Sequence, residues 1–264
     1  MDGFTLVRGT LPLLISMPHA GTELPQTLAG RMTPAAARLD DTDWHLPRLY
    51  DFALAMGASL LVPHHSRYVI DLNRPPDNAN LYPGQDTTGL CPVDTFNKEA
   101  LYQPGETPLE DEITERVNRY WRPYHEALRH EIARLQARHG QILLWEAHSI
   151  RSHVPRFFEG RLPDFNLGSA DGASCRPGLA EKLLEVARDN AAGFSAVLNG
   201  RFKGGYITRA YGTPDSGVQA VQLELAQSCY MQEQLPYAYS EALATRVQPV
   251  LRALLTTALA ALGG

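Results

Sequence analysis

The chain has 264 residues, with 24 lysines and arginines against 29 aspartates and glutamates, which gives a formal net charge of −5. This charge argues against a dedicated nucleic-acid binder, and a content of 44% hydrophobic and 20% charged residues excludes disorder of the whole chain. The three widely spaced cysteines fit neither a disulfide framework nor a CxxC zinc cage. Because no apolar run reaches the ~20 residues of a membrane span and MDGFTLVRG lacks the basic-then-apolar layout of a secretion signal, we expect a cytoplasmic protein without a membrane partner.

The first part of the chain alternates short apolar runs with helical patterns. A helical region is expected to open at Thr33-Pro34, where a cap residue precedes a first-turn proline, and to restart near Asp43 and run to Met56. Strands are predicted at Leu11–Ser16, Ser59–Val62 and Tyr68–Leu72.

Residues 75–107 differ from the rest of the chain because they hold five prolines and three glycines and show no periodicity. A segment of this length and composition predicts a long ordered loop or a lid. The spacing of Thr107 and Glu110 then predicts a capping box, followed by a long amphipathic helix that bends at Pro123 and ends at His139 before Gly140.

The second half continues the alternation of strands and helices. Gln141–Trp145 (QILLW) is the strongest buried-strand pattern, and Val218–Leu225 alternates within an apolar run. Strands separated by helices predict one α/β domain with a mostly parallel or mixed sheet covered on both faces. The remaining predicted elements are Leu179–Asn190 and Tyr237 to about Leu262 as helices, and Ser195–Leu198 as a strand.

Ligands of α/β sheets bind at the carboxyl ends of strands, so polar residues at those ends are candidates for a site. His19 follows the first strand, and the small residues Ala20 and Gly21 allow a ligand to approach the backbone. Glu146 and His148 follow QILLW, where an imidazole can bind zinc and a carboxylate can orient it. Each histidine could also be a structural residue of the core.

The run RYVIDLNR places two arginines around a predicted strand end. Strand alternation predicts Arg67, Val69 and Asp71 on one face. Because a guanidinium fork matches the geometry of a carboxylate, the two arginines, Arg67 and Arg74, together with Asn73 could bind a carboxylate. The alternative is a set of salt bridges at the surface.

Glu224 lies within the otherwise apolar run VQLELAQ. Burying a carboxylate is costly unless it is paired or functional, so Glu224 is a candidate general base for water. The alternative is a glutamate at a strand edge that faces solvent. The cluster Asp40, Asp41 and Asp43 and the glycine-rich segment 204–209 are weaker candidates, for a metal ligand and an anion-binding loop respectively.

Motifs for several other reactions are missing from the sequence. It contains no GxSxG elbow, no GxxxxGK[ST] phosphate loop, no GxGxxG after a strand and no HExxH. What remains is a metal site made of dispersed histidines and carboxylates, next to arginines able to hold an anionic substrate.

Six motifs between Pro18 and Gln227 resemble, in order, those of the N-formylglutamate amidohydrolase family: PHAGTELP, DTDWH, SRYVIDLNRPP, LLWEAHS, GGYITRAYG and VQLELAQ. That family is similar in fold to zinc carboxypeptidases and aspartoacylases. The resemblance implies a single catalytic domain over residues 1–264, built as a three-layer α/β/α sandwich with a mixed, mostly parallel sheet. It also implies one Zn²⁺ per chain and hydrolysis of N-formyl-L-glutamate to formate and L-glutamate, a late step of histidine degradation.

The resemblance also implies roles for individual residues. His19 and His148 correspond to two zinc ligands, with Asp43 as the carboxylate ligand and Glu23 as the second choice. Three protein ligands leave one zinc position open, as in catalytic sites. The other implied roles are a general base at Glu224, a carbonyl-polarising group at Arg67, and binders of the substrate carboxylates at Asn73, Arg74 and Arg209, with Tyr206 assisting.

Two other functions stay open at this point. One is a deacylase for another acidic N-acyl amino acid, as in aspartoacylases, and the other is a binder of an acidic metabolite in which the histidines are structural. Both share the expectation of a small acidic ligand. The sequence does not fix the oligomeric state, although a monomer is compatible with it.

Overall fold

The computed structural model describes residues 3–263. In this part of the chain, seven strands form one sheet in the order β1-β3-β2-β4-β7-β5-β6. The pairs β2–β3, β2–β4, β4–β7 and β5–β6 are parallel, whereas β1–β3 and β5–β7 are antiparallel. The strands are β1 (Phe4–Val7), β2 (Leu13–Ser16), β3 (Ser59–Pro63), β4 (Ile142–Ile150), β5 (Phe165–Gly168), β6 (Ala196–Leu198) and β7 (Val218–Ala226).

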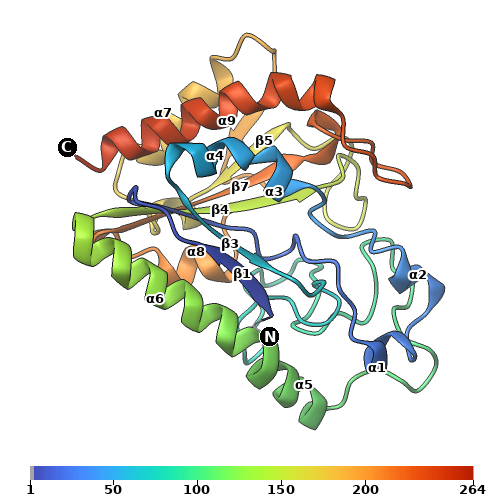
Figure 1. Ribbon diagram of the computed structural model, residues 1–264. Helices are drawn as coiled ribbons and strands as arrows, with labels where there is room; N and C mark the ends of the chain where they lie inside the picture. Colours follow the sequence, from blue (N-terminus) through green and yellow to red (C-terminus); the bar gives the residue numbers. More distant parts are fainter. Residues whose placement is uncertain (1–2, 264) are drawn as a thin grey trace.

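Helices cover both faces of the sheet, which confirms the predicted three layers (Figure 1). On one face, Trp145 of β4 belongs to a core cluster with the helices α3 (Leu46–Leu49), α4 (Asp51–Met56), α7 (Leu179–Arg188) and α9 (Glu241–Ala261). On the other face, Leu144 packs with α6 (Arg122–His139) and α8 (Tyr206–Tyr211). The short helices α1 (Gln26–Ala29) and α2 (Pro34–Ala37) and the helix α5 (Glu110–Arg116) lie beyond the sheet.

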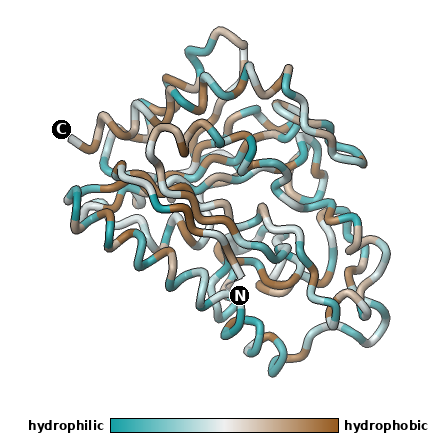
Figure 2. Tube along the Cα trace, viewed as in Figure 1, coloured by the Kyte–Doolittle hydropathy of each residue, from teal (hydrophilic) through white to brown (hydrophobic). Residues whose placement is uncertain are grey.

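The hydropathy of the chain follows these layers. Hydrophobic residues run along the strands, while hydrophilic residues dominate the outer surface of α5 and α6 (Figure 2). Every residue of β4 and β7 is buried, because helices cover both faces of these neighbouring strands. A polar side chain on either strand is therefore desolvated unless it faces a cavity.

The long helix predicted over residues 110–139 is interrupted. A π-helical turn, Val117–Trp121, separates α5 from α6, and Pro123 stands in the first turn of α6, where its missing N–H costs no bond. Gly140, with φ of 76°, ends α6 as predicted. The predicted capping box is wrong, because Leu109 is the N-cap residue and no side chain caps α5.

The strand predicted at Tyr68–Leu72 is also wrong, because residues 66–74 form consecutive turns. The apolar side chains of this segment enter two separate clusters instead of one sheet face: Tyr68 and Val69 pack in one, Ile70 and Leu72 in the other. The amide of the buried Asp71 donates a hydrogen bond to the Leu90 carbonyl at 2.7 Å, which ties this segment to the loop that follows it.

The bounds of other predicted elements differ from those in the structure, and some of these differences affect the site. β4 runs on to Ile150, so Glu146 and His148 lie within the strand and not after it. The segment Gly204–Arg209 is partly helical, because α8 starts at Tyr206. The helical region after residue 33 restarts at Leu46, which leaves Asp43 in an irregular segment. β1 and β5 were not predicted; both have only four residues.

Residues 75–107 contain no helix or strand, as expected for a long loop, apart from isolated bridges at Asp94 and Tyr102. Cys91, Cys175 and Cys229 are buried and unpaired. Among the described residues, no helix is long and apolar enough to cross a membrane.

Candidate active site

His19, Asp43 and His148 come together at the carboxyl end of the sheet. His19 follows β2, His148 lies in the adjacent strand β4, and the Asp43 amide donates to the His19 carbonyl at 3.1 Å, which fixes the irregular segment beside the strand end. One ligand atom from each side chain lies within 4.8 Å of the others, and all three residues are buried. This is the geometry of a metal-binding cluster.

Each imidazole of the cluster turns its Nδ1 toward the shared centre and its Nε2 toward a carboxylate. His19 Nε2 lies 2.6 Å from Asp71 Oδ1, and His148 Nε2 lies 2.8 Å from Glu146 Oε1. The Nδ1 atoms lie 3.8 Å and 3.0 Å from Asp43 Oδ2 for His19 and His148, respectively. A carboxylate on Nε2 fixes the tautomer that leaves Nδ1 free as a ligand.

The two orienting carboxylates are themselves held in place. Glu146 Oε2 accepts hydrogen bonds from the Thr208 amide at 3.0 Å and from the Thr208 hydroxyl. Asp71 accepts from the Asn73 amide at 2.9 Å and pairs with the Arg67 guanidinium at 2.7 Å. Helix α8, through Thr208, and the turn segment 66–74 therefore hold the two carboxylates that orient the histidines.

The donor set fits a divalent metal. Two imidazole nitrogens and one carboxylate oxygen are the ligands that zinc takes in catalytic sites with an open position. Burial and the nearby Arg67 lower the pKa of His19, which keeps that imidazole neutral. Burial also opposes protonation of His148, but Glu146 and Asp43 outweigh it and hold the pKa of His148 well above its ordinary value. A metal ion would replace the His148 proton that faces Asp43.

Glu224 stands beside this cluster. It pairs in register with His148 across β4 and β7, and its side chain lines the same pocket as both histidines. No hydrogen bond to its carboxylate is found within residues 3–263, so the group faces the pocket. Burial, opposed by His148 and reinforced by Asp43, raises the pKa of Glu224 to about 8 without a metal. A bound cation would favour the ionised form of this carboxyl.

Arg67 reaches the cluster from the turn segment. Its guanidinium donates to His19 Nδ1 at 3.1 Å and packs over the Phe96 ring at 4.9 Å, in addition to its pair with Asp71. Arg67 and Asp71 meet as an i,i+4 pair across turns, whereas the sequence predicted that strand alternation would bring them together.

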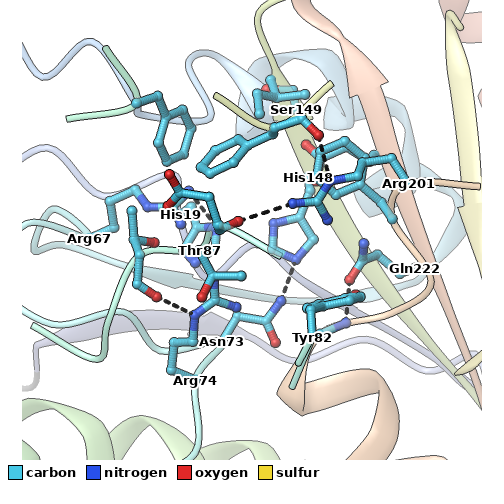
Figure 3. Close-up of a pocket in the computed structure, with 18 residues that line it drawn as sticks. His19, Arg67, Asn73, Arg74, Tyr82, Thr87, His148, Ser149, Arg201 and Gln222 are labelled. Atoms are coloured by element: carbon cyan, nitrogen blue, oxygen red, sulfur yellow. Dashed lines mark hydrogen bonds between the residues drawn. The ribbon is translucent and has the colours of Figure 1, made fainter. Parts of the chain in front are cut away.

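The pocket in front of the cluster measures about 600 Å³. Figure 3 shows Arg67, Arg74 and Arg201 around His19 and His148; the first two come from the turn segment 66–74 and Arg201 from a separate part of the chain. The loop 75–107 contributes part of the wall. The other polar or aromatic residues of the lining include Asn73, Tyr82, Thr87, Thr88, Phe96, Ser149, Phe157 and Gln222.

Two aromatic residues of the interrupted helix hold the segment that carries Asn73 and Arg74. Trp121 Nε1 donates to the Arg74 carbonyl at 3.0 Å, and His125 Nε2 donates to the Leu72 carbonyl at 2.9 Å. The two rings stack with centroids 3.7 Å apart. Burial lowers the pKa of His125 to about 3, so this histidine stays neutral and keeps its donor. The π-helical turn places both donors on the face that meets this segment.

Three residues proposed from the sequence lie elsewhere. Arg209 is exposed, its Nε donates to the Gly204 carbonyl at 2.8 Å, and it does not line the pocket. Tyr206 packs edge-on against His125 and also lies outside the lining. Glu23, the second choice for the carboxylate ligand, is exposed, and the metal-type cluster in the described part of the chain does not contain it.

Several residues of the site were not singled out from the sequence. Arg201 lies in a short glycine-flanked segment that looks like a turn, and only its contacts with distant loops reveal it. Trp121 and His125 were read as residues of an ordinary amphipathic helix. The one available signal for them was the crowding of aromatic residues around Pro123, in YWRPYH.

An α/β/α fold with a buried His/Asp/His cluster, a carboxylate facing the same pocket and an arginine beside it has the parts of a hydrolytic enzyme. Comparison with known proteins makes the assignment specific. The model of the N-formylglutamate amidohydrolase family matches residues 11–231. The chain belongs to this family and is an amidohydrolase.

Two similar proteins come from pseudomonads. The chain is 54% identical to the N-formylglutamate deformylase of Pseudomonas aeruginosa over 253 residues, covering 96% of this chain and 94% of that protein. The same identity and coverage hold for the N-formylglutamate deformylase of Pseudomonas putida.

Solved structures share the fold. The N-formylglutamate amidohydrolase of Ralstonia eutropha superposes with a TM-score of 0.81 at 27% identity, covering 100% of this chain and 98% of that one. A gene product of Agrobacterium tumefaciens has a TM-score of 0.71 at 20% identity, covering 100% of this chain and 97% of that one. At this identity the likeness shows the fold alone.

Proposed function

We propose that the protein hydrolyses N-formyl-L-glutamate to formate and L-glutamate and that the reaction depends on zinc. The observation that carries this proposal is the convergence of His19, Asp43, His148 and Glu224 on one pocket that also receives arginines. The names of the two pseudomonad relatives support the substrate. We further propose that the reaction is the late step of histidine degradation that releases glutamate.

His19 Nδ1, His148 Nδ1 and an Asp43 oxygen would hold the metal. When bound, zinc supplies Lewis-acid polarisation of the formyl group and of the attacking water. Asp71 and Glu146 keep the two imidazoles in the ligand tautomer, and they prevent either ring from rotating away.

The side chains around the metal position then divide the remaining work. Glu224 takes the proton of the attacking water, since its carboxylate faces the pocket without a partner in residues 3–263. It returns this proton to the departing glutamate nitrogen as the C–N bond breaks. Arg67 donates to the oxygen on which negative charge develops, and loss of one such donor typically costs roughly 10²–10³ in rate.

Asn73 and Arg74 bind a carboxylate of the substrate. The Asn73 amide nitrogen lies 3.0 Å from His148 Nε2, so this pair stands directly beside the proposed metal ligands. Within residues 3–263 the Arg74 guanidinium has one hydrogen bond, from Nε to the Thr88 carbonyl at 3.0 Å, which leaves its terminal nitrogens available for a bidentate contact.

Steady-state rates test this function against the two alternatives. The zinc-loaded protein should release formate from N-formyl-L-glutamate with a higher kcat/KM than it shows for acetate release from N-acetyl-L-glutamate or N-acetyl-L-aspartate. A preference for an acetylated substrate would favour the aspartoacylase-like alternative. No turnover of any of the three, together with tight binding of glutamate, would identify a binder of acidic metabolites.

A further inference from the structure

Arg201 is a half-buried arginine of the pocket whose charge is not neutralised. Its Nε donates to the Phe157 carbonyl at 2.7 Å and one terminal nitrogen approaches the Asp86 carbonyl at 3.3 Å. Both partners are backbone oxygens. In residues 3–263, no carboxylate lies within ion-pair distance of this guanidinium, although 29 acidic residues occur in the chain.

Asp86, one of the acidic residues around Arg201, is already paired with other cations. Asp86 pairs with Arg156 at 2.9 Å through one oxygen and with Lys98 at 3.0 Å through the other, so only its backbone carbonyl turns to Arg201. Arg156 also binds Asp94 at 2.8 Å, which fixes this arrangement. Asp86 is thus paired with other cations, and Glu224, which faces the same pocket, attracts Arg201 without lying within ion-pair distance of it in residues 3–263.

The side chain is nevertheless held in a defined position. The Arg201 guanidinium carbon lies 5.4–5.6 Å from the ring centroids of Tyr82, Phe157 and Phe202. Burial, reinforced by the positive charge of Arg74, lowers the pKa of Arg201. Arg74 and Arg201 line the same pocket, and neither guanidinium has an ion pair in residues 3–263, so an anionic ligand bound near both would be stabilised.

We propose that Arg201 binds the side-chain carboxylate of the substrate and thereby selects glutamate, while Arg74 binds the α-carboxylate. This inference rests on the proposed function and goes beyond it by assigning the second carboxylate. Arg74 follows Asn73, which touches the metal-ligand candidate His148, so it stands where the carboxylate nearest the scissile bond must lie. Arg201 enters from a separate segment, between the Phe157 and Asp86 backbones (Figure 3).

The assignment replaces Arg209 by Arg201 as the partner of the second carboxylate. Arg209 is exposed, and its guanidinium carbon lies 5.4 Å from the ring centroid of Tyr82, a residue of the loop 75–107. It therefore supports the wall of the pocket and does not reach its interior.

The test compares two substrates of equal size, N-formyl-L-glutamate and N-formyl-L-glutamine, in the zinc-loaded protein. In Arg201→Met, kcat/KM for the glutamate substrate should fall by about 10- to 100-fold, the range for losing a charged hydrogen-bonded contact, whereas the glutamine substrate should change by less than about threefold. In Arg74→Met, kcat/KM should fall to a similar extent for both substrates. Arg201→Lys keeps the positive charge but loses the forked guanidinium, so its kcat/KM for N-formyl-L-glutamate should lie between those of the wild type and Arg201→Met.

Arg246→Met is the matched control, because Arg246 also donates to a backbone carbonyl, that of Ala192 at 3.0 Å, and lies over a phenyl ring, but far from the pocket lining. It should leave both rates unchanged. The assignment is wrong if Arg201→Met and Arg201→Lys retain the wild-type preference for the glutamate substrate over the glutamine substrate. It is also wrong if kcat/KM falls equally for both substrates in these variants.

A binding measurement separates this inference from the proposed function. If the wild-type protein does not release formate, the proposed function fails, and calorimetry with L-glutamate and L-glutamine still tests the subsite. The wild-type protein should bind glutamate more tightly, and Arg201→Met should remove the difference. Equal affinity of the wild-type protein for the two ligands would contradict the role of Arg201.

Discussion

Replacing Trp121 by phenylalanine removes one hydrogen bond that holds the Arg74 backbone and leaves a ring to stack on His125. The lost bond is the 3.0 Å contact from the indole N–H to the Arg74 carbonyl. A buried acceptor left without its donor costs roughly 1–3 kcal/mol, which in a protein of this size lowers Tm by about 2–4 °C for each kcal/mol. Because the same bond positions Arg74, we expect KM for N-formyl-L-glutamate to rise about fivefold or more, with kcat within about twofold of wild type.

Trp145→Phe is the control for this experiment. Its indole also donates one buried hydrogen bond, to the Tyr50 hydroxyl at 3.1 Å, but it lies in the core cluster on the opposite side of β4 from His148. This variant should lose comparable stability with KM unchanged. Thermal unfolding and steady-state kinetics on both variants decide the matter: equal KM values in Trp121→Phe and Trp145→Phe would refute a positioning role for Trp121.

Three further predictions concern the centre of the site. His148→Ala and Asp43→Ala should each lose bound zinc and activity with the fold intact, whereas Glu23→Ala should keep both; metal analysis checks this, and full zinc occupancy in His148→Ala would rule that residue out as a ligand. Glu224→Gln should retain zinc and substrate affinity while kcat falls by ~10²–10⁴ and the acidic limb of the pH–rate profile vanishes or shifts; loss of zinc would instead make Glu224 a ligand. Arg67→Lys should lower kcat by roughly 10²–10³ with little change in zinc content, and an unchanged kcat would exclude its role at the developing negative charge.

The parts of the fold and site that could be predicted from the sequence depend on strong local patterns. QILLW and VQLELAQ are continuous apolar runs, so their burial as central strands follows directly, and a carboxylate such as Glu224 inside one of them stands out. The strands β1 (FTLV) and β5 (FNLG) were not recognised because neither has the continuous apolar run of the equally short β2 (LLIS) or β6 (AVL). Their place in the sheet is decided by pairing with distant strands, for which the sequence holds no local signal.

The turn segment after residue 66 shows where local reasoning fails. Its apolar residues look like a strand, but the buried ion pair of Arg67 with Asp71 and the bond of Asp71 to His19 decide the backbone path. The role proposed for Arg201 also could not be predicted locally, because it depends on the pairing of Asp86 with Lys98 and Arg156. Such assignments depend on contacts between residues far apart in the chain, and spacing alone does not reveal them.

The central claim is that a metal bound by His19, Asp43 and His148 supports hydrolysis of N-formyl-L-glutamate. The most direct test removes metal with a chelator and titrates zinc back while formate release and bound zinc are measured on the same sample. The account predicts that activity disappears with the metal and returns in proportion to zinc up to about one ion per chain. Full formate release by the metal-free protein, or zinc binding that restores none of it, would contradict the account.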